Sequence, residues 1–211
     1  MKIQIEKEPA DREPLKGDAL PADFRPILTI DVLGDSRTLL LVNGLETALF
    51  VLLVLAGFLA VADNPVHPVL SLAYWPYFGW MMAVLAACAL CVFSHLYLHG
   101  LLLEHYGGGR PSFGFCHMYV YTWCPEPLEK KNYLKAILAP VILCGIALLI
   151  LSLILPPIWR TAAYIVQIAN LCCSGRDFYV AIKLFSLRQK ALIHDQGLKL
   201  TAYGPGSEYP L

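Results

Sequence analysis

Long apolar runs constrain this chain more than any other feature of its sequence. Four runs, at residues 38–62, 78–105, 136–155 and 158–187, are each at least 20 residues long. A helix of that length, at about 1.5 Å per residue, crosses the roughly 30 Å of hydrocarbon in a bilayer. The composition agrees, because 57% of the residues are hydrophobic and 15% are charged, against about 25% charged in soluble domains. The sequence therefore predicts an all-α integral membrane protein with four transmembrane helices.

The distribution of Lys and Arg gives the orientation. Six precede the first run, none lies between the first two runs, four lie between the second and third, and five follow from Arg176 onward. Positive residues mark the cytoplasmic side, so we expect both termini and residues 106–135 there. The polar start of the chain predicts no cleavable signal peptide. We expect a cytoplasmic arm at 1–37, a four-span membrane domain at 38–187 and a cytoplasmic tail at 188–211.

The segment between the second and third runs alternates between rings and smaller residues. Its rings stand at every second position, at Phe113, Phe115, His117, Tyr119, Tyr121 and Trp123. Successive side chains of a strand point to opposite faces. The sequence therefore predicts a β-hairpin or a single strand here, on the cytoplasmic side, with every ring on one side at the membrane surface.

Two more pieces outside the apolar runs have patterns typical of strands. We expect residues 26–33 to be extended. The Asp195-Gln-Gly197 turn between two short apolar pieces predicts a small hairpin in the tail.

Ionisable residues inside the apolar runs mark one layer of the membrane. His95 and His99 are one helical turn apart, so both leave the same face of the second helix. With the predicted topology, Glu46 on the first helix and Asp177 on the fourth lie at a similar depth. Such groups are costly in a membrane and usually functional, and two imidazoles with a carboxylate suit zinc. The same histidine spacing also occurs in helices without a metal, so the residues alone leave both interpretations open.

A polar stripe on the fourth run faces the same layer. Gln167, Asn170, Ser174 and Asp177 recur at steps of three, four and three, as expected for one face of a single helix. Asn170 and Ser174 are therefore expected either to orient the metal ligands through hydrogen bonds or to form hydrogen bonds between helices.

Other candidate ligands have weaker patterns. Cys88 and Cys91 form a C-x-x-C on the helix face of His95, which makes a thiolate and imidazole site an alternative. Most of the seven cysteines lie in apolar runs, however, where they are expected to pack as small hydrophobes. The remaining candidates are expected in the opposite loop (His67), on another helix face (Glu104, His105) or at the surface (His117, His194).

Several of these motifs occur in the order found in one known family. They are His95-Leu-Tyr-Leu-His99-Gly, Gly107-Gly-Gly, the ring-bearing strand, Pro140, Gly175-Arg-Asp177 and Lys190-Ala-Leu-Ile-His-Asp. Over roughly residues 38–203 the chain resembles the putative zincin peptidase family of bacterial multi-pass membrane proteins. That family has no known function and is similar in layout to site-2 proteases.

The resemblance implies a bacterial inner-membrane protein with a zinc ion held by His95, His99 and Asp177. The histidines match those of the family's H-E-x-x-H motif, and Asp177 matches the aspartate of its Gly-Asp motif. The resemblance also implies a peptide or membrane-protein substrate along the 113–123 strand, whereas the residues alone favour an interfacial anchor. The chain departs from the family at the glutamate position, which holds Leu96. In a zincin that glutamate takes a proton from zinc-bound water, and leucine cannot.

Three functions are compatible with these observations. The first is a site-2-protease-like zinc protein impaired as a peptidase, a pseudoenzyme that holds membrane substrates. The second is an active zinc metallopeptidase with another base, for which Glu46 is the candidate. The alternative roles for Glu46 are a fourth metal ligand and a partner of Arg176. The third is a transporter of a metal or small solute; a haem-binding bundle is disfavoured because the first, third and fourth runs contain no histidine. We expect no nucleic-acid partner, and the sequence leaves the oligomeric state open.

Overall fold

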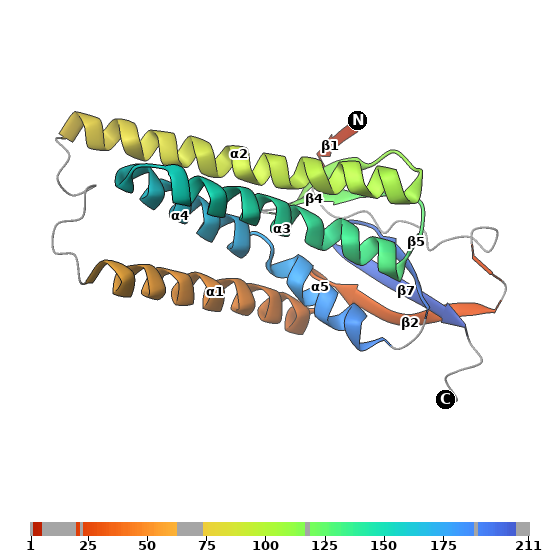
Figure 1. The fold of residues 1–211 in the computed structure, drawn as a ribbon. Coiled ribbons are helices and arrows are strands. Elements are labelled where there is room, and N and C mark those ends of the chain that lie inside the picture. The colour runs from red at the N-terminus through yellow and green to blue at the C-terminus, as the bar shows by residue number, and fades with distance from the viewer. Residues whose placement is uncertain are drawn as a thin grey trace. The chain divides into compact units, whose positions relative to one another are not determined.

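The computed structural model describes residues 2–5, 20–21, 23–62, 74–116, 119–187 and 190–205. Helices α1 to α5 and strands β1 to β7 follow in the order β1-β2-α1-α2-β3-β4-β5-α3-α4-α5-β6-β7 (Figure 1). The chain divides into two compact units. Unit one comprises residues 1–41, 96–139 and 177–211, and unit two comprises residues 42–95 and 140–176. Of the loop predicted at 63–77, residues 63–73, with His67, lie outside the described residues, as does His117, whereas residues 74–77 are helical.

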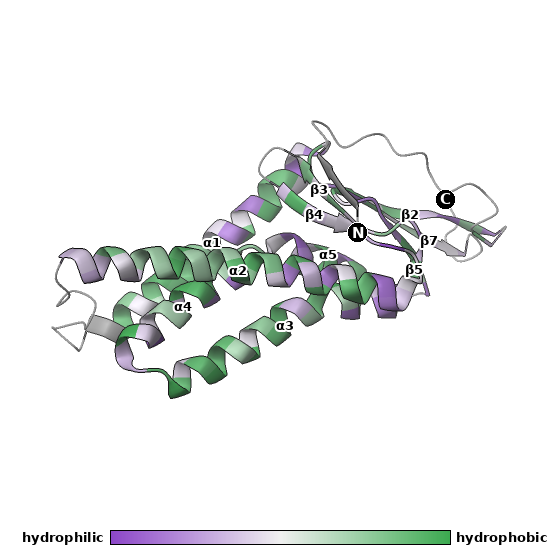
Figure 2. Ribbon diagram, turned by 90° about the horizontal axis from the view of Figure 1, so that it is seen from above, coloured by the Kyte–Doolittle hydropathy of each residue, from purple (hydrophilic) through white to green (hydrophobic). Residues whose placement is uncertain are grey.

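Three helices are long and apolar enough to cross a membrane, namely α1 (Ser36–Ala62), α2 (Tyr74–Gly107) and α3 (Lys130–Ile154). Figure 2 shows them largely in green, the colour of hydrophobic residues. Many of their large apolar side chains are exposed, Leu153 by 73% and Phe58 by 70%, which suits lipid and is unfavourable in water. The structure thus supports the predicted membrane protein.

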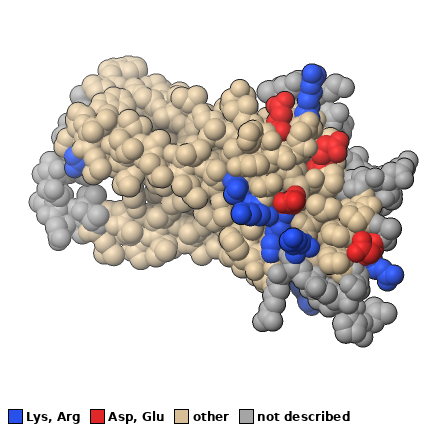
Figure 3. Space-filling view, turned by 45° about the vertical axis from the view of Figure 1, so that its right-hand side comes forward, with Lys and Arg blue, Asp and Glu red and all other residues tan. Residues whose placement is uncertain are grey.

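Charged residues are concentrated in unit one. Unit two contains only four of them, Glu46, Asp63, Arg160 and Arg176. On the face drawn in Figure 3, most blue and red side chains gather together, and a broad tan region has almost none. A charge-poor helical region of this kind is what a bilayer requires.

The ends of the long helices follow local sequence signals. Asp35 precedes α1, and its Oδ2 accepts a hydrogen bond of 3.3 Å from the main-chain N–H of Thr38, as an N-terminal capping residue does. The same oxygen accepts a hydrogen bond of 2.7 Å from Thr38 Oγ1. This bond is the main reason why the pKa of the Asp35 carboxyl is lowered. α2 ends at Gly107, and Gly108 follows with a φ of 71°, a conformation that glycine adopts without strain. The helix thus ends at the glycine run that follows the second apolar run.

The fourth apolar run does not form one helix. It is divided into α4 (Pro157–Cys172) and α5 (Gly175–Ser186). The 16 residues of α4 extend about 24 Å, less than the roughly 30 Å of a bilayer core. The single fourth helix predicted over 158–187 is therefore wrong, and three helices qualify as candidate spans. Gly175 lies at the break, where a residue of low helix propensity favours an end.

In unit two, α4 bonds to each of the long helices. Tyr164 Oη donates to the carbonyl of Leu53 on α1 at 2.6 Å. On α2, Trp80 Nε1 donates to the α4 carbonyl of Ile158 at 3.3 Å. The amide of Asn170 reaches α3, as described below. Because no water competes inside a bilayer, polar groups there must find partners within the protein. α4 therefore organises this unit.

Unit one contains a four-stranded antiparallel sheet in the order β2-β7-β6-β5. Its strands are β2 (Phe24–Asp31), β7 (Lys199–Pro205), β6 (Leu192–Asp195) and β5 (Leu128–Glu129). The predicted tail hairpin is confirmed as β6 and β7, with Gly197 at a φ of 95° in the turn. The extended piece near 26–33 is β2. The sheet packs with α3 and α5 around a core that includes Tyr133, Leu184 and Ile193.

Unit one also contains a three-stranded sheet in the order β1-β3-β4. β3 (Ser112–Cys116) and β4 (Tyr119–Trp123) form the predicted hairpin, and β1 (Lys2–Ile5) lies parallel to β3. The two sheets make the protein less purely helical than the sequence predicted.

The prediction that every ring of the hairpin lies on one side is wrong. In the β3–β4 register, Phe113 pairs with Thr122 and Tyr121 pairs with Gly114. Directly paired residues point to the same face of a sheet. Each pair joins an odd-numbered with an even-numbered residue, so the rings of β3 lie on one face and those of β4 on the other.

Candidate metal centre

The two histidines of α2 lie one turn apart in an unbroken helix. His95 is 7% exposed and His99 is 8% exposed. Their common helix face, predicted from the sequence, follows from the continuous α-helical backbone between Tyr74 and Gly107. Each imidazole has a polar neighbour from the region of α4 and α5.

His99 is paired with Asp177, the candidate ligand from the fourth run. His99 Nε2 lies 3.2 Å from Asp177 Oδ2. Asp177 is in the first turn of α5 and is 7% exposed. The positive end of the helix dipole favours a carboxylate at this position. Because burial of a carboxylate is costly without a partner, this pair suits a site that is completed by a cation.

His95 is paired with Asn170 of α4. The distance from His95 Nδ1 to Asn170 Oδ1 is 3.3 Å, and Asn170 Nδ2 donates to the carbonyl of Val141 on α3, also at 3.3 Å. Since the amide nitrogen is directed at a carbonyl, its oxygen is the atom left for the imidazole. These bonds assign the proton to His95 Nδ1 and leave the lone pair on Nε2, the form that a metal binds.

Ser174 supports Asn170 rather than a histidine. Its Oγ donates to the main-chain carbonyl of Asn170 at 2.6 Å, and its side chain is fully buried. This bond lies at the end of α4, where carbonyls lack helical partners. The polar stripe predicted on one helix thus continues across the break, with Asn170 in α4, Ser174 between the helices and Asp177 in α5.

His95, His99 and Asp177 form a group that could hold a metal ion. Each offers one ligand atom, and these atoms lie within 4.8 Å of one another. Zinc bonds of about 2.1 Å in a tetrahedron separate ligand atoms by about 3.4 Å, close to the 3.2 Å between His99 and Asp177. Two imidazoles with a carboxylate are also a donor set of catalytic zinc sites. The residues present therefore fit zinc, and within the described ranges no cysteine joins this group.

The face of α2 next to the histidines is covered by the β3–β4 hairpin. Thr122 Oγ1 of β4 donates to the carbonyl of Leu96 at 3.5 Å. One turn further on, a Cβ on Gly100 would lie 2.7 Å from Cζ of the Phe113 ring. Because Gly100 has no side chain, the Phe113 ring of β3 packs directly against the α2 backbone. Leu96, between the two histidines in sequence, presents a hydrocarbon side chain that accepts no proton.

Glu46 of α1 lies against the junction of α4 and α5. The side chain packs so closely on Gly175 that a Cβ there would lie 2.7 Å from Glu46 Oε1. Glu46 is half-buried. Gly175 precedes Asp177 by two residues, so Glu46 contacts the segment that leads to the candidate ligand. Its role as a base remains a prediction.

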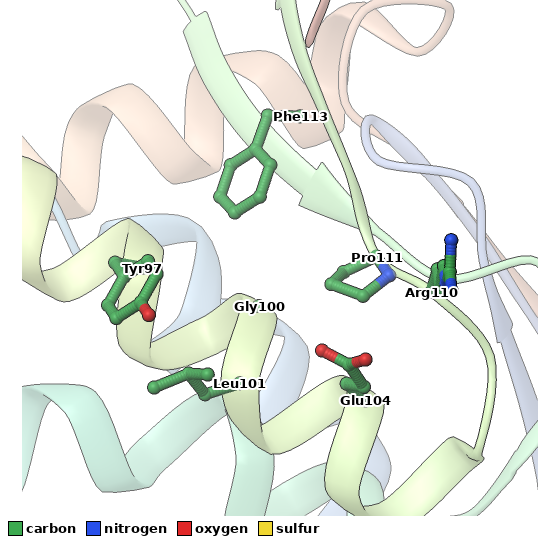
Figure 4. Close-up of a pocket in the computed structure, with 7 residues that line it drawn as sticks. All are labelled: Tyr97, Gly100, Leu101, Glu104, Arg110, Pro111 and Phe113. Carbon is green, nitrogen blue, oxygen red and sulfur yellow. The ribbon is translucent and has the colours of Figure 1, made fainter. Parts of the chain in front are cut away.

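A pocket of about 360 Å³ lies beside α2 in unit one. Figure 4 shows its lining, which is Tyr97, Gly100, Leu101, Glu104, Arg110, Pro111 and Phe113. Glu104 is five residues beyond His99, which places it about 140° away around the helix. It is therefore off the histidine face, as the sequence predicted. The pocket itself was not predicted, although Tyr97, Gly100 and Glu104 form a stripe at helical spacing.

One histidine differs from its prediction. His194, expected at the surface, is 7% exposed on β6, because the tail hairpin is part of a packed sheet rather than a free appendage. Its neighbour Asp195 accepts a hydrogen bond of 2.6 Å from Tyr133 Oη of α3. The sequence had indicated Asp195 only as a turn residue.

The fold and this group define a membrane protein with a buried two-histidine, one-aspartate centre. Residues 88–192 match the model of a family described as putative zincin peptidase. The matched part carries His95, His99 and Asp177, and the match agrees with the resemblance that the motifs predicted. Comparisons with curated proteins and with solved structures give no match.

Proposed function

We propose that the protein is a site-2-protease-like zinc protein of the membrane that does not carry out zincin-type peptide hydrolysis. The observation that carries this proposal is a complete His-His-Asp group with a leucine where the family has its general base. His95, His99 and Asp177 are the proposed zinc ligands. Leu96 occupies the position of the missing glutamate.

The ligands and the base have separate tasks. Zinc, when bound, supplies a Lewis acid and lowers the pKa of a water molecule. Asn170 holds His95 in the tautomer that leaves Nε2 for the ion. A general base contributes about 10² to 10⁴ in rate, and Leu96 has no atom that takes a proton. Metal binding without ordinary hydrolysis is the expected result.

The setting that we propose is the inner membrane of a bacterium. Both termini and residues 106–135 are cytoplasmic, with 1–37 as the arm, 38–187 as the membrane domain and 188–211 as the tail. The substrate or client is a peptide or a segment of a membrane protein that pairs with the hairpin at 113–123. The Lys and Arg distribution supports the orientation. The β3–β4 hairpin supports peptide pairing, because an extended peptide can add to the edge of a sheet.

A second candidate function is hydrolysis with Glu46 as the base. The contact between Glu46 and Gly175 favours it, because this contact brings a carboxylate to the segment that carries Asp177. A base must come within hydrogen-bond reach of the reacting water, directly or through one more water.

Zinc content and peptide cleavage test the proposal together. We expect about one zinc per chain in the purified protein and loss of it in the His95→Ala, His99→Ala double variant. His105→Ala is the matched control, since this histidine stacks edge-on with Tyr106 on the same helix. Unchanged zinc in the double variant contradicts the site.

The cleavage assay uses a library of membrane peptides with the unaltered chain, Leu96→Glu and Glu46→Gln. We expect no zinc-dependent turnover by the unaltered chain and measurable turnover by Leu96→Glu. Zinc-dependent turnover by the unaltered chain contradicts the proposal that the protein does not hydrolyse peptides. Loss of that turnover in Glu46→Gln then establishes the second candidate.

A further inference from the structure

The N-terminal strand β1 occupies one edge of the β3–β4 hairpin. Lys2 pairs with Ser112, Ile3 with Phe113, Gln4 with Gly114 and Ile5 with Phe115, all in parallel. In the sheet order β1-β3-β4, β3 is the central strand only because β1 is there. Without β1, β3 would present an unpaired row of main-chain donors and acceptors, which is a template for an extended peptide.

The hairpin is held in place by contacts that do not involve β1. β3 and β4 pair through five residue pairs. The Phe113 ring rests on Gly100 of α2, and Thr122 bonds to the Leu96 carbonyl. The Tyr121 ring packs against Gly114 and Gly197. The edge of β3 is therefore preorganised, and a ligand that takes the place of β1 need not order it.

β1 itself is a weak occupant by the general rules of strand pairing. It has four residues, fewer than the usual five or six, and parallel pairing is slightly less stable per residue than antiparallel pairing. It also joins β3 across more than a hundred residues of sequence, so a long loop must close to form the pair. A short parallel strand of this kind can be displaced by a peptide that pairs with β3 over more residues.

We propose that the outer edge of β3 is a binding edge for an extended peptide in parallel orientation, and that residues 2–5 are its resident occupant. This inference rests on and deepens the peptide-binding part of the proposed function. A client has to displace residues 2–5 before it pairs with residues 112–115. The pocket of Figure 4 adjoins the Pro111 end of β3, where a parallel peptide begins, and it can receive one of the client's side chains.

A reversible lock tests this exchange. The variant with Lys2→Cys and Ser112→Cys places thiols at a paired position and should form a disulfide on mild oxidation, mapped by mass spectrometry. The control, Lys2→Cys with Val120→Cys, should not, because Val120 is on β4 and pairs with Phe115. Equal cross-linking in both variants, or none in the first, overturns the register.

The probe is a fluorescent synthetic peptide with the sequence of residues 1–8. The tethered β1 competes with the free peptide for the same edge, so replacing residues 2–5 by Gly and Ser should tighten peptide binding by about tenfold or more. The oxidised lock should bind no peptide, and reduction should restore binding in the same sample. Equal binding by the locked and reduced forms, or no gain on replacing residues 2–5, overturns the proposal.

Peptide exchange and zinc binding can fail separately. The His95→Ala, His99→Ala variant should keep the exchange while losing zinc, because β1 and β3 contain none of the proposed ligands. If the unaltered chain holds no zinc but the exchange behaves as expected, the proposed metal function fails and this inference stands. If zinc binds as expected and the lock has no effect, the reverse holds.

Discussion

At the scale of single residues, Asn170 has two partners that together determine the state of His95. Its Nδ2 donates to the Val141 carbonyl and its Oδ1 faces His95 Nδ1. An amide whose nitrogen is already engaged with an acceptor cannot turn over without leaving a buried group unpaired. The sequence suggested two roles for Asn170, a hydrogen bond to a metal ligand or a hydrogen bond between helices. The two bonds show that Asn170 contacts a histidine and also joins two helices.

Asn170→Leu should weaken zinc binding by about 10- to 100-fold, the usual effect of removing the partner of a metal-binding histidine. Asn170→Asp keeps an acceptor for His95 Nδ1 and should retain most of the affinity. A competition titration with a chelating dye measures both variants. Gln167→Leu is the control from the same helix, because no described bond joins Gln167 to a histidine. Equal loss in the Asp and Leu variants would show that the acceptor oxygen is not what matters.

At the scale of elements, a buried hydrogen bond joins α3 to the turn between β6 and β7. Tyr133 is fully buried, and its hydroxyl donates to Asp195 Oδ2 at 2.6 Å. Asp195 Oδ1 accepts from the main chain of Gly197 at 2.9 Å. The carboxylate thus fixes its own turn and anchors it to a helix. The tail hairpin is therefore part of unit one and not a separate appendage.

Tyr133→Phe should destabilise the protein by about 1.5–3 kcal/mol, the range for a hydrogen bond to a charged group, because a buried carboxylate loses a donor. Thermal unfolding in detergent measures the change. Tyr74→Phe removes the same hydroxyl from a residue that is 75% exposed, and it should have almost no effect. A Tyr133→Phe variant as stable as the Tyr74→Phe control would mean that Asp195 is satisfied in another way.

Elements formed by neighbouring residues could be predicted from the sequence, and long-range arrangements could not. The histidine face followed from helical periodicity, and the tail turn followed from Asp195 and Gly197. The break at Gly175 was missed because polar steps of three and four suit one helix as well as two short ones. The two faces of the hairpin depend on its register, which alternation alone does not define. The pairing of β1 with β3 had no local signal.

At the scale of the whole molecule, the split of the fourth run raises a question of topology. Three long helices alone would place the two termini on opposite sides of a membrane. The Lys and Arg distribution predicts that both lie on the cytoplasmic side, and this orientation would require α4 to lead the chain back across. α4 extends about 24 Å, and it bonds to α1, α2 and α3. Because α4 bonds to three other helices, its polar groups have partners within the protein, and α4 with the residues that follow it can lead the chain across although α4 is shorter than the bilayer core.

The position of the C-terminus separates these two topologies. We expect an epitope tag after Leu211 to react with antibody only after permeabilisation of the cells, as should a tag after Glu129. A tag after Asn64, between the first two spans, should react in intact spheroplasts and serves as the positive control. If the Leu211 tag reacts in intact spheroplasts while the Glu129 tag does not, α4 and α5 do not return across the membrane. Asp177, which follows α4, would then lie on the side opposite to the one that the charge distribution predicts.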